Sequence, residues 1–277
     1  MKFTKMHGIS NDYVYVNCLA ESVPNPAETA RLVSDRRCGI GSDGMILILP
    51  SAIADFKMEI YNADGSQAEM CGNGIRCVGK YVYDRGLTDK TTLTVETLGG
   101  IKTLQLHLMQ NQVDTVTVDM GEPILEPAKI PVLSDLDRVV DAPVVVAGKT
   151  YNITCVSMGN PHAVVFLPEI DSLKLEEIGP AFEYHKMFPK RINTEFIRVI
   201  DDHTLQMRVW ERGAGETWAC GTGATASLVA AALCGKTGRE AELRLRGGNL
   251  QIRWDADTNH VFMTGPAAFV FDGEITL

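Results

Sequence analysis

Two copies of one short segment constrain this chain more than any other feature. The segment CGNG at 71–74 recurs as CGTG at 220–223, an offset of 149 residues, and the same offset relates Asn11 to Asn160. It also aligns the run FKMEIYN at 56–62 with LQMRVWE at 205–211. The sequence therefore predicts a duplicated fold with one such thiol, Cys71 or Cys220, in each half. A symmetric pair of thiols suits a reaction that needs an acid and a base on opposite faces of one substrate carbon.

Length and composition agree with two soluble domains. At 277 residues the chain exceeds the usual size of a single domain, and each half is long enough to bury its own core. Hydrophobic residues make up 45% of the chain and charged residues 22%, which is typical of globular proteins. The net charge of −9 argues against nucleic acid as a partner.

The N-terminal residues and the cysteines indicate a cytoplasmic protein. Residues 1–8 lack the apolar stretch of a signal peptide, and the longest apolar runs, such as 227–234, are too short to span a bilayer. The seven cysteines include no Cys-x-x-Cys pair, which fits neither a disulfide framework nor a zinc site. We therefore expect no metal site and no membrane partner, and we expect most of the cysteines to be buried.

Alternating β-branched and aromatic residues predict many short strands. In the first half they cover 13–18, 45–49, 56–61, 91–96, 102–108 and 113–120. In the second half they cover 154–156, 163–167, 195–199, 205–211, 242–245, 250–254, 261–264 and 269–271. Helical spacing of apolar residues predicts helices at 27–36, 75–84 and 224–233. The last of these is apolar on nearly all sides, so it must be buried.

These elements favour an α+β fold over a doubly wound nucleotide-binding fold, because strands outnumber helices. We expect two pseudo-symmetric domains that arose by internal duplication. Each is expected to be a curved, mostly antiparallel sheet wrapped around a central helix, with the active site in the cleft between the domains. The prolines between the halves mark the crossover from one domain to the next, at Pro123, Pro127, Pro131 and Pro143.

Both cysteines directly precede a helix that begins with Gly-x-Gly. A thiol there lies at the positive end of the helix dipole, so we expect the pKa of Cys71 and of Cys220 to be lowered. The glycine-rich first turns also leave backbone N–H groups available to a carboxylate. They would stabilise the charge that spreads into this carboxylate when the α-proton leaves. A tight turn with an incidental thiol is the alternative for either segment alone, but two copies in one register argue against it.

Several polar residues around the two segments are candidates for ligand binding. Four asparagines lie beside glycine or proline turns, where Asn often serves only as a turn former, and these are Asn11, Asn62, Asn160 and Asn193. Their register within the repeat favours ligand binding instead. Asn62 aligns with Glu211, and Gly44 aligns with Asn193, so the halves differ where a chiral substrate needs unlike surroundings.

Two charged or titratable residues in the second half have an open interpretation. Arg212 follows Glu211 at a strand end and can bind a carboxylate through two parallel hydrogen bonds, although a solvated charge pair is common there. His162 lies two residues after Asn160. It either tunes a nearby thiol or is an ordinary hydrogen-bonded histidine, and spacing alone leaves both roles open.

The sequence resembles the diaminopimelate epimerase family over almost its whole length. The motifs that carry the resemblance are HGISND at 7–12, NADGS at 62–66, MCGNGIRC at 70–77, GNPH at 159–162, ERG at 211–213 and ACGTG at 219–223. Paired Cys-Gly-x-Gly segments also occur in the related proline racemase-like enzymes.

The resemblance implies an epimerase that interconverts LL- and meso-diaminopimelate, in lysine and peptidoglycan precursor biosynthesis, without pyridoxal phosphate or another cofactor. It implies that Cys71 and Cys220 exchange the roles of base and acid with the direction of reaction, and that His162 and Glu211 help to set their protonation. The reacting carboxylate would lie on the backbone of Gly72, Asn73, Gly221 and Thr222. The rest of the substrate would be bound by Asn11, Asn62, Asn160, Asn193, Glu211 and Arg212.

Two positions depart from the family pattern. Some members carry Gln where Gly44 stands, and some carry Tyr where Phe271 stands, a position linked in the family to dimerisation. A homodimer is still expected, because Phe can pack at an interface without the hydroxyl. In the family the C-terminal strand returns to the first domain. This implies a discontinuous first domain of residues 1–119 and 265–277, and a second domain of residues 120–264.

Two alternative functions remain open from the sequence. A proline or hydroxyproline racemase would use the same chemistry, but it has no use for Arg212 at the far end of its substrate. A thiol-switch or anion-binding protein would use the glycine loops without turnover. Against the second alternative, neither segment contains the Lys-Ser/Thr of a phosphate loop or a resolving cysteine at two-residue spacing.

Overall fold

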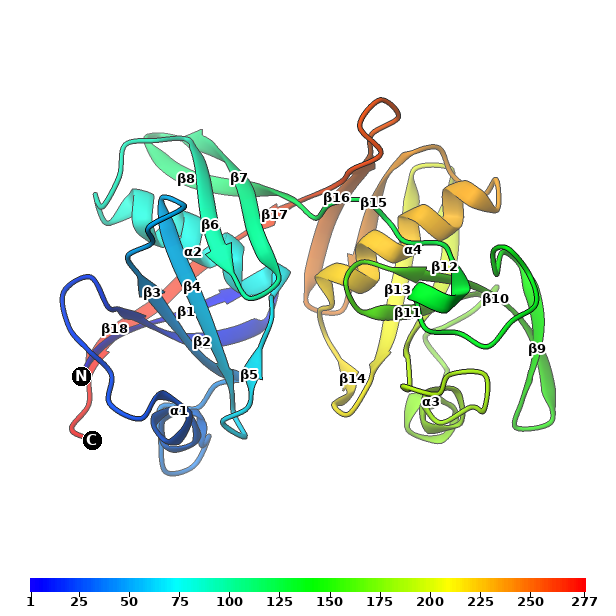
Figure 1. Cartoon of the computed structure of the whole chain (residues 1–277), viewed down its shortest axis with the longest axis horizontal. Helices are drawn as coiled ribbons and strands as arrows, with labels where there is room; N and C mark the ends of the chain where they lie inside the picture. Colours follow the sequence, from blue (N-terminus) through cyan, green and yellow to red (C-terminus); the bar gives the residue numbers. More distant parts are fainter. The chain divides into compact units, whose positions relative to one another are not determined.

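The computed structural model describes all residues of the chain, 1–277, and divides into two compact units. Unit 1 consists of Met1–Asp119 and Thr264–Leu277, and unit 2 consists of Met120–Met263. Figure 1 shows the path of the chain, in which the red C-terminal strand returns to the blue N-terminal strands. No helix is long and apolar enough to cross a membrane.

Unit 1 contains two helices and a sheet. Its strands are β1 (Lys2–Gly8), β2 (Asn11–Asn17), β3 (Gly44–Leu49), β4 (Phe56–Asn62), β5 (Gln67–Ala68), β6 (Thr92–Thr97), β7 (Gly100–Met109), β8 (Gln112–Asp119) and β18 (Ala268–Glu274). Its helices are α1 (Pro26–Ser34) and α2 (Gly72–Asp84). The C-terminal strand β18 pairs antiparallel with β1, which ties the two chain ends together.

Unit 2 repeats this series. Its strands are β9 (Ala142–Val146), β10 (Lys149–Ser157), β11 (Pro161–Phe166), β12 (Asn193–Asp201), β13 (Thr204–Glu211), β14 (Gly215–Thr217), β15 (Glu240–Leu245) and β16 (Gly248–Trp254). Its helices are α3 (Leu175–Glu183) and α4 (Gly221–Leu233), with a 3₁₀ turn at Pro127–Lys129. Strand β17 (Val261–Pro266) carries the chain from unit 2 back to unit 1.

The duplication predicted from the two cysteine segments is confirmed by the pairing of the strands. In unit 1, β2 runs parallel to β3, β3 antiparallel to β4, and β4 parallel to β6. In unit 2 the equivalent strands β11, β12, β13 and β15 make the same three pairings in the same order. The offset of 149 residues also carries α1 onto α3 and α2 onto α4.

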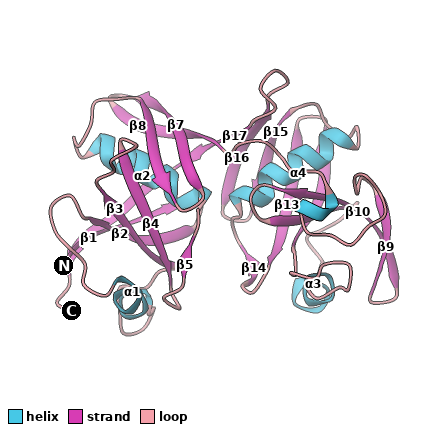
Figure 2. Cartoon of the chain, viewed as in Figure 1, coloured by secondary structure: helices cyan, strands magenta, loops and turns pink.

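Each sheet wraps around one buried helix, as predicted for this α+β fold. Helix α2 packs against β1, β2, β7 and β8, and α4 packs against β10, β11, β12, β15 and β16. Figure 2 shows these two helices among the strands of their own units. In α4 the sequence ATASLVAA at 224–231 is buried on every side, because small side chains let strands approach from several directions. Burying one side chain such as Leu228 contributes about 2 kcal/mol.

The structure corrects several predicted elements. Helices α2 and α4 begin at Gly72 and Gly221, three residues before their predicted starts, because the glycines form the first turn. Strands β1, β5, β9 and β14 and helix α3 were not predicted. Helix α3 contains Gly179 and Pro180, which disfavour helices. Gly179 is required there, because a Cβ atom at this position would lie 2.2 Å from the Trp210 ring.

Candidate active site

Each catalytic candidate is the N-cap residue of the central helix in its unit. Cys71 has φ −137° and ψ 112°, and Cys220 has φ −131° and ψ 107°, so both backbones are extended just before the helix begins. The Cys71 Sγ accepts a hydrogen bond from the Gly74 N–H at 3.3 Å, and the Cys220 Sγ accepts one from the Gly223 N–H at 3.4 Å. Each sulfur therefore takes the place that a Ser or Asp side chain usually takes at a helix start.

The surroundings of Cys71 are polar but contain no carboxylate in direct contact. Its Sγ donates to the Asn11 side-chain oxygen at 3.3 Å, and the Asn73 side chain also donates to that oxygen at 3.4 Å. The Asn11 amide nitrogen donates in turn to Asp43 at 2.7 Å, which fixes the orientation of the amide. Asn11 and Asn73, both predicted from the sequence, therefore meet at the Cys71 thiol.

Two residues that the sequence analysis did not select influence Cys71. The Tyr13 hydroxyl hydrogen-bonds the thiol, and the buried Arg76 guanidinium lies nearby with bonds to the Gly72 carbonyl at 3.0 Å and to the Asn73 side chain at 3.0 Å. Burial raises the pKa of Cys71, whereas the bond from the Gly74 N–H, the bond from Tyr13 and the charge of Arg76 oppose that rise.

The surroundings of Cys220 are more acidic than those of Cys71. The carboxylate of Glu211 lies at the end of β13, where it accepts a hydrogen bond from the Thr217 hydroxyl. Thr222, predicted as a binding residue, brings its hydroxyl to 3.6 Å from the Cys220 Sγ. Burial raises the pKa of Cys220 well above its ordinary value, and the charges of Glu211 and Glu195 raise it further.

The expectation that the helix dipole lowers the pKa of both thiols is wrong. Hydrogen bonds from the first helical turn do act in that direction. They are outweighed because removing a thiolate from water costs more than a terminal N–H bond returns. The pKa of Glu211 is also raised by burial, although the bond from Thr217 and the charge of His162 oppose this.

His162 forms a buried polar pair with Glu195. The distance from His162 Nδ1 to Glu195 Oε1 is 2.7 Å, and the distance from His162 Nε2 to the Asn160 side-chain oxygen is 3.0 Å. Both His162 and Glu195 have no exposed side-chain surface. The structure thus brings the predicted residues Asn160 and His162 together and adds Glu195, which the sequence analysis did not select.

The remaining predicted residues lie at strand ends. Asn193 begins β12, donates to the Pro161 carbonyl at 2.9 Å and accepts from the Arg212 N–H at 2.8 Å. The Arg212 side chain is exposed and bonds the Lys190 carbonyl at 3.0 Å. Asn62 ends β4 opposite Gly44 and bonds the Ser66 hydroxyl at 3.0 Å, which is a turn contact. Asn193 and Arg212 are therefore neighbours, whereas the side chain of Asn62 bonds within its own turn.

The missed residues could have been found by applying the repeat offset at every position. The offset pairs Tyr13 with His162, Ile46 with Glu195, and Arg76 with Thr225. In each pair only one member carries a charge, or readily gains one, near neutral pH. These members are His162, Glu195 and Arg76.

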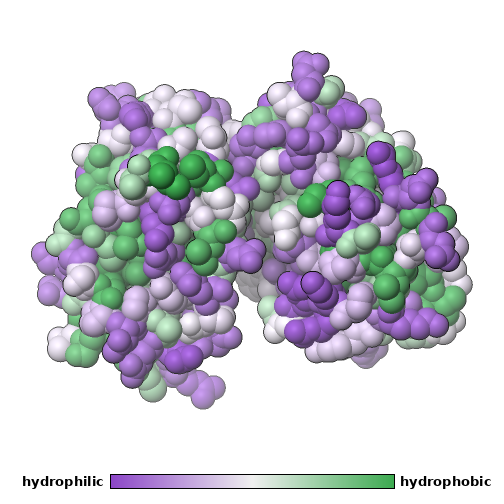
Figure 3. Space-filling model, in the orientation of Figure 1, coloured by the Kyte–Doolittle hydropathy of each residue, from purple (hydrophilic) through white to green (hydrophobic).

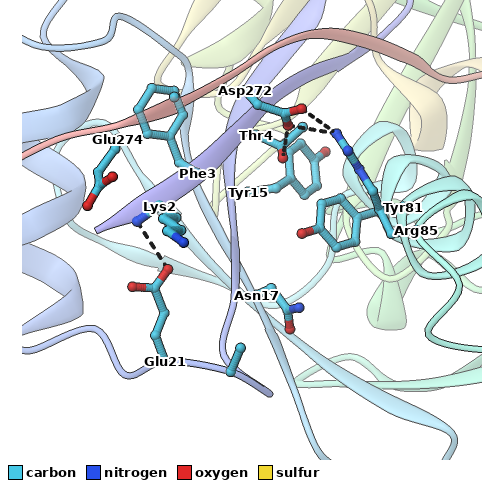
Figure 4. A pocket seen from close by; sticks show the side chains of 12 residues that line it. Lys2, Phe3, Thr4, Tyr15, Asn17, Glu21, Tyr81, Arg85, Asp272 and Glu274 are labelled. Atoms are coloured by element: carbon cyan, nitrogen blue, oxygen red, sulfur yellow. Dashed lines mark hydrogen bonds and ion pairs between the residues drawn. The ribbon is translucent and has the colours of Figure 1, made fainter.

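Two surface cavities are lined by residues other than the predicted site residues. In unit 1 a cavity of about 470 Å³ lies beside β1 and β18, and Figure 4 shows Arg85 and Thr4 bonded to Asp272 on its wall. In unit 2 a more apolar cavity of about 740 Å³ lies beside β9 and includes Val145, Lys186 and Met187. Figure 3 shows hydrophilic side chains over much of the visible face, with hydrophobic ones between them. No group of three or more His, Cys, Asp or Glu side chains is placed to hold a metal ion.

Comparison with proteins of known structure supports the fold. The chain is similar to a probable proline racemase from Agrobacterium radiobacter K84, with a TM-score of 0.73 and 14% identity, covering 100% of this chain and 93% of the other. It is also similar to a PhzF-family phenazine biosynthesis protein from Enterococcus faecalis, with a TM-score of 0.71 and 13% identity over 100% of both chains. At these identities the likeness concerns the fold alone.

Comparison of sequences shows the family. The sequence model of the diaminopimelate epimerase family matches residues 3–126 and 154–270. A diaminopimelate epimerase from Acetivibrio thermocellus is 60% identical over 100% of this chain and 99% of its own length. One from Methanococcus maripaludis is 57% identical over the full length of both proteins. The family match covers both cysteine segments, and on this evidence the chain belongs to the diaminopimelate epimerase family.

Proposed function

We propose that the protein interconverts LL- and meso-diaminopimelate, an isomerase reaction in lysine and peptidoglycan precursor biosynthesis. The observation that carries the proposal is the pair of N-cap thiols on equivalent helices of a duplicated fold, in a chain of this family. Inverting one α-carbon requires a proton to leave one face and another to arrive on the opposite face. Two thiols, one ionised and one protonated, supply the base and the acid.

The reaction balances without an added reactant. The thiolate of one cysteine removes the α-proton and becomes a thiol, and the electron pair of the C–H bond spreads into the adjacent carboxylate. The thiol of the other cysteine then donates its proton to the opposite face and becomes the thiolate. The product has the inverted configuration, and the two cysteines have exchanged roles. The reverse reaction therefore begins from the state in which the forward reaction ends.

The first turns of α2 and α4 are proposed to bind the reacting carboxylate. The proposed contacts are the backbone N–H groups of Gly72, Asn73, Gly221 and Thr222. Helix N-termini favour anions, because their first N–H groups have no acceptor within the helix and the dipole is positive there. The same N–H groups stabilise the charge that develops as the α-proton leaves, which lowers the barrier.

The rest of the substrate is proposed to be bound by polar residues at strand ends. Arg212 suits the distal carboxylate, because its guanidinium is exposed just after β13 and one of its nitrogens donates to the Lys190 carbonyl, which leaves the other N–H groups for a ligand. Asn193 supports it by bonding the Arg212 N–H. The other proposed contacts are Asn11, Asn62, Asn160 and Glu211.

A substrate panel distinguishes this proposal from the related racemases. We expect turnover of LL- and meso-diaminopimelate and none of proline or hydroxyproline. Arg212→Ala should raise KM for diaminopimelate by about 100-fold, because a two-bond contact to a carboxylate contributes about 3 kcal/mol. Arg198→Ala, at a partly exposed position in the same unit, serves as the control. Turnover of proline with an unchanged KM for diaminopimelate in Arg212→Ala would contradict the assignment.

The protein is further proposed to act in the cytoplasm as a homodimer that uses β18. Val270 and Phe271 on this strand are exposed, and Phe271 packs edge-on against Phe3 at 5.9 Å. Exposed adjacent apolar side chains favour a partner surface. Phe271→Asp should give a monomer by light scattering, and Ile53→Asp, at a similarly exposed position away from β18, should leave the dimer intact. A monomeric wild-type chain would contradict this part of the proposal.

A further inference from the structure

Glu195 is a buried carboxylate without a full set of partners. It lies on β12 with no exposed side-chain surface, and its Oε1 atom bonds His162 Nδ1 at 2.7 Å. Its Oε2 atom is buried and has no hydrogen-bond partner. Burying a carboxylate that is only half satisfied destabilises a fold. Because this carboxylate lowers stability, we expect it to have a role other than packing.

Glu195 lies next to the first turn of α4. A Cβ atom built on Gly223 would lie 2.6 Å from Glu195 Oε1 and 3.2 Å from the Cys220 Sγ. The carboxylate and the thiol therefore border the same small space, which only glycine leaves open. The N–H of this glycine also donates to the Cys220 Sγ. The charge of Glu195 thus acts on Cys220 at short range.

The duplication provides an internal comparison for Glu195. At the equivalent position in unit 1 stands Ile46, whose Cδ1 atom would lie 2.5 Å from a Cβ atom on Gly74. The same space beside the helix start is therefore filled by a methyl group near Cys71 and by a carboxylate near Cys220. Near Cys71 the charged neighbour is instead the cation Arg76. The two thiols stand in opposite electrostatic surroundings.

We propose that Glu195 is a positioning residue that holds His162 by its Nδ1 hydrogen and, by its negative charge, keeps Cys220 as the thiol, so that Cys71 is the first of the two thiols to ionise in the substrate-free enzyme. The proposal rests on the proposed function, because only that reaction uses the thiolate as a base and the thiol as an acid. When one thiol loses its proton, the base is then Cys71 and the acid is Cys220. Glu195 itself touches neither the substrate nor the reacting carbon.

The other titratable groups near Cys220 and Glu195 come from the surrounding strands. They are His162 on β11, Glu211 on β13 and Cys155 on β10. The charges of Glu211 and Glu195 both raise the pKa of Cys220. Burial, followed by the charge of Glu195, raises the pKa of Cys155 as well, so Cys155 stays a neutral thiol. Removing the Glu195 charge should therefore favour the Cys220 thiolate.

The test is the pH dependence of alkylation by iodoacetamide, followed separately for Cys71 and Cys220 by peptide mass spectrometry. Only the thiolate reacts, and the midpoint of each profile is independent of how accessible the sulfur is. In the wild-type chain we expect the Cys71 midpoint to lie below the Cys220 midpoint. In Glu195→Gln the Cys220 midpoint should fall by about one pH unit, while the Cys71 midpoint stays in place.

Two further variants separate charge from packing. Glu195→Asp keeps the charge with a shorter side chain, so it should lower the melting temperature yet leave the Cys220 midpoint closer to the wild-type value than Glu195→Gln does. Glu183→Gln removes another buried carboxylate of unit 2, one that bonds Trp210 and the Gly213 N–H. It should leave the Cys220 midpoint unchanged.

Three outcomes would overturn the proposal. They are a wild-type Cys220 midpoint at or below that of Cys71, an unchanged Cys220 midpoint in Glu195→Gln, and equal shifts at both cysteines. The first is measured on the unaltered chain, so it does not depend on the folding of any variant. Alkylation needs no turnover. A chain that shows the expected shift but does not epimerise diaminopimelate would therefore contradict the proposed function and not the role of Glu195.

Discussion

At the scale of single residues, the two halves are alike in what holds the sulfur and unlike in what surrounds it. The N-cap geometry and the glycine N–H bond are repeated at Cys71 and Cys220. The neighbours differ, because a methyl group occupies the place of the Glu195 carboxylate and a tyrosine the place of His162. In the proposed function, these substitutions one layer behind the two thiols give a chiral substrate the unlike surroundings that it needs.

Gly223→Ala tests this arrangement. Its methyl group would lie 2.6 Å from Glu195 Oε1, so the carboxylate or the helix start must move. We expect a loss of about 1–3 kcal/mol in the free energy of unfolding, and at least a tenfold loss of kcat/KM because the His162–Glu195 pair is displaced. Chemical denaturation and initial rates measure both quantities. Gly238→Ala is the control, because no atom lies within 4 Å of the added methyl group, and it should change neither the free energy of unfolding nor kcat/KM. Equal losses in the two variants would contradict the close contact between residue 223 and Glu195.

The pH dependence of the reaction follows from the two thiols. Turnover requires one thiolate, and burial raises the pKa of both Cys71 and Cys220 above the ordinary value of 9.0. A group with a raised pKa is protonated at neutral pH, so the active state with one thiolate is scarce there. We expect kcat/KM to rise steadily between about pH 7 and pH 9. A profile that is flat or falls across this interval would contradict the raised pKa of both thiols.

The site could be predicted from sequence only in part. The repeated motif identified both cysteines, their glycines and the asparagines that share their register. The direction of the thiol pKa could not be predicted, because burial and charges such as that of Glu195 at Cys220 come from residues far away in the sequence. The contact between Asn193 and Arg212 could not be predicted either, because these residues lie at strand ends that only the folded sheet brings together.

At the scale of elements, the site depends on two central helices held rigidly inside their sheets. Helix α4 is built from small and apolar residues, and ten of its residues from Gly221 to Ala231 are buried. Its N-terminus is therefore fixed by packing on β10, β11, β12, β15 and β16. A thiol at the start of such a helix keeps its position relative to the strand ends that carry Glu211 and His162.

Leu228→Ala tests how much α4 contributes to stability. The side chain is fully buried, so its truncation should lower the free energy of unfolding by about 2–5 kcal/mol through lost burial and the cavity left behind. Urea denaturation gives the value. Leu32→Ala, on the exposed face of α1 at 59% exposure, should cost no more than about 0.5 kcal/mol. Similar losses at the two positions would show that α4 is not the centre of a core.

Most strands and the central helices were predictable because their apolar patterns are strong. Helix α3 was missed because Gly179 and Pro180 lower its intrinsic helix propensity, whereas the fold keeps it by packing Gly179 against Trp210. Strand β9 was missed because it is short, lies within a proline-rich stretch and is defined by its pairing with β10. Both α3 and β9 form because of contacts with distant segments of the chain. A short window of sequence does not contain these contacts.

At the scale of the whole molecule, buried thiols link stability to alkaline pH. Burial raises the pKa of Cys77 from 9.0 to about 11. Above pH 9.0 the unfolded chain releases this proton while the folded chain keeps it, so the stability from the neutral thiol is complete below 9.0 and is lost by about 11. The loss for Cys77 is about 3 kcal/mol.

Melting temperatures from pH 8 to about pH 11 measure this linkage, in the wild-type chain and in Cys77→Ala. We expect the wild-type melting temperature to fall across the interval and the variant, although less stable at pH 8, to show a shallower fall. The exposed Cys38→Ala should follow the wild-type slope. Parallel curves for the wild type and Cys77→Ala would contradict the raised pKa of Cys77.

The proposed reaction depends on two thiols that act on one α-carbon. Epimerisation in heavy water tests this directly. At early times, mass spectrometry should find one deuterium at the α-carbon of the product and almost none in the remaining substrate, because the group that donates differs from the group that accepts. This should hold in both directions, and Cys71→Ala and Cys220→Ala should each abolish product formation, whereas Cys38→Ala should retain it. Substrate that gains deuterium as fast as product forms, or a wild-type rate in either active-site variant, would contradict the two-thiol account.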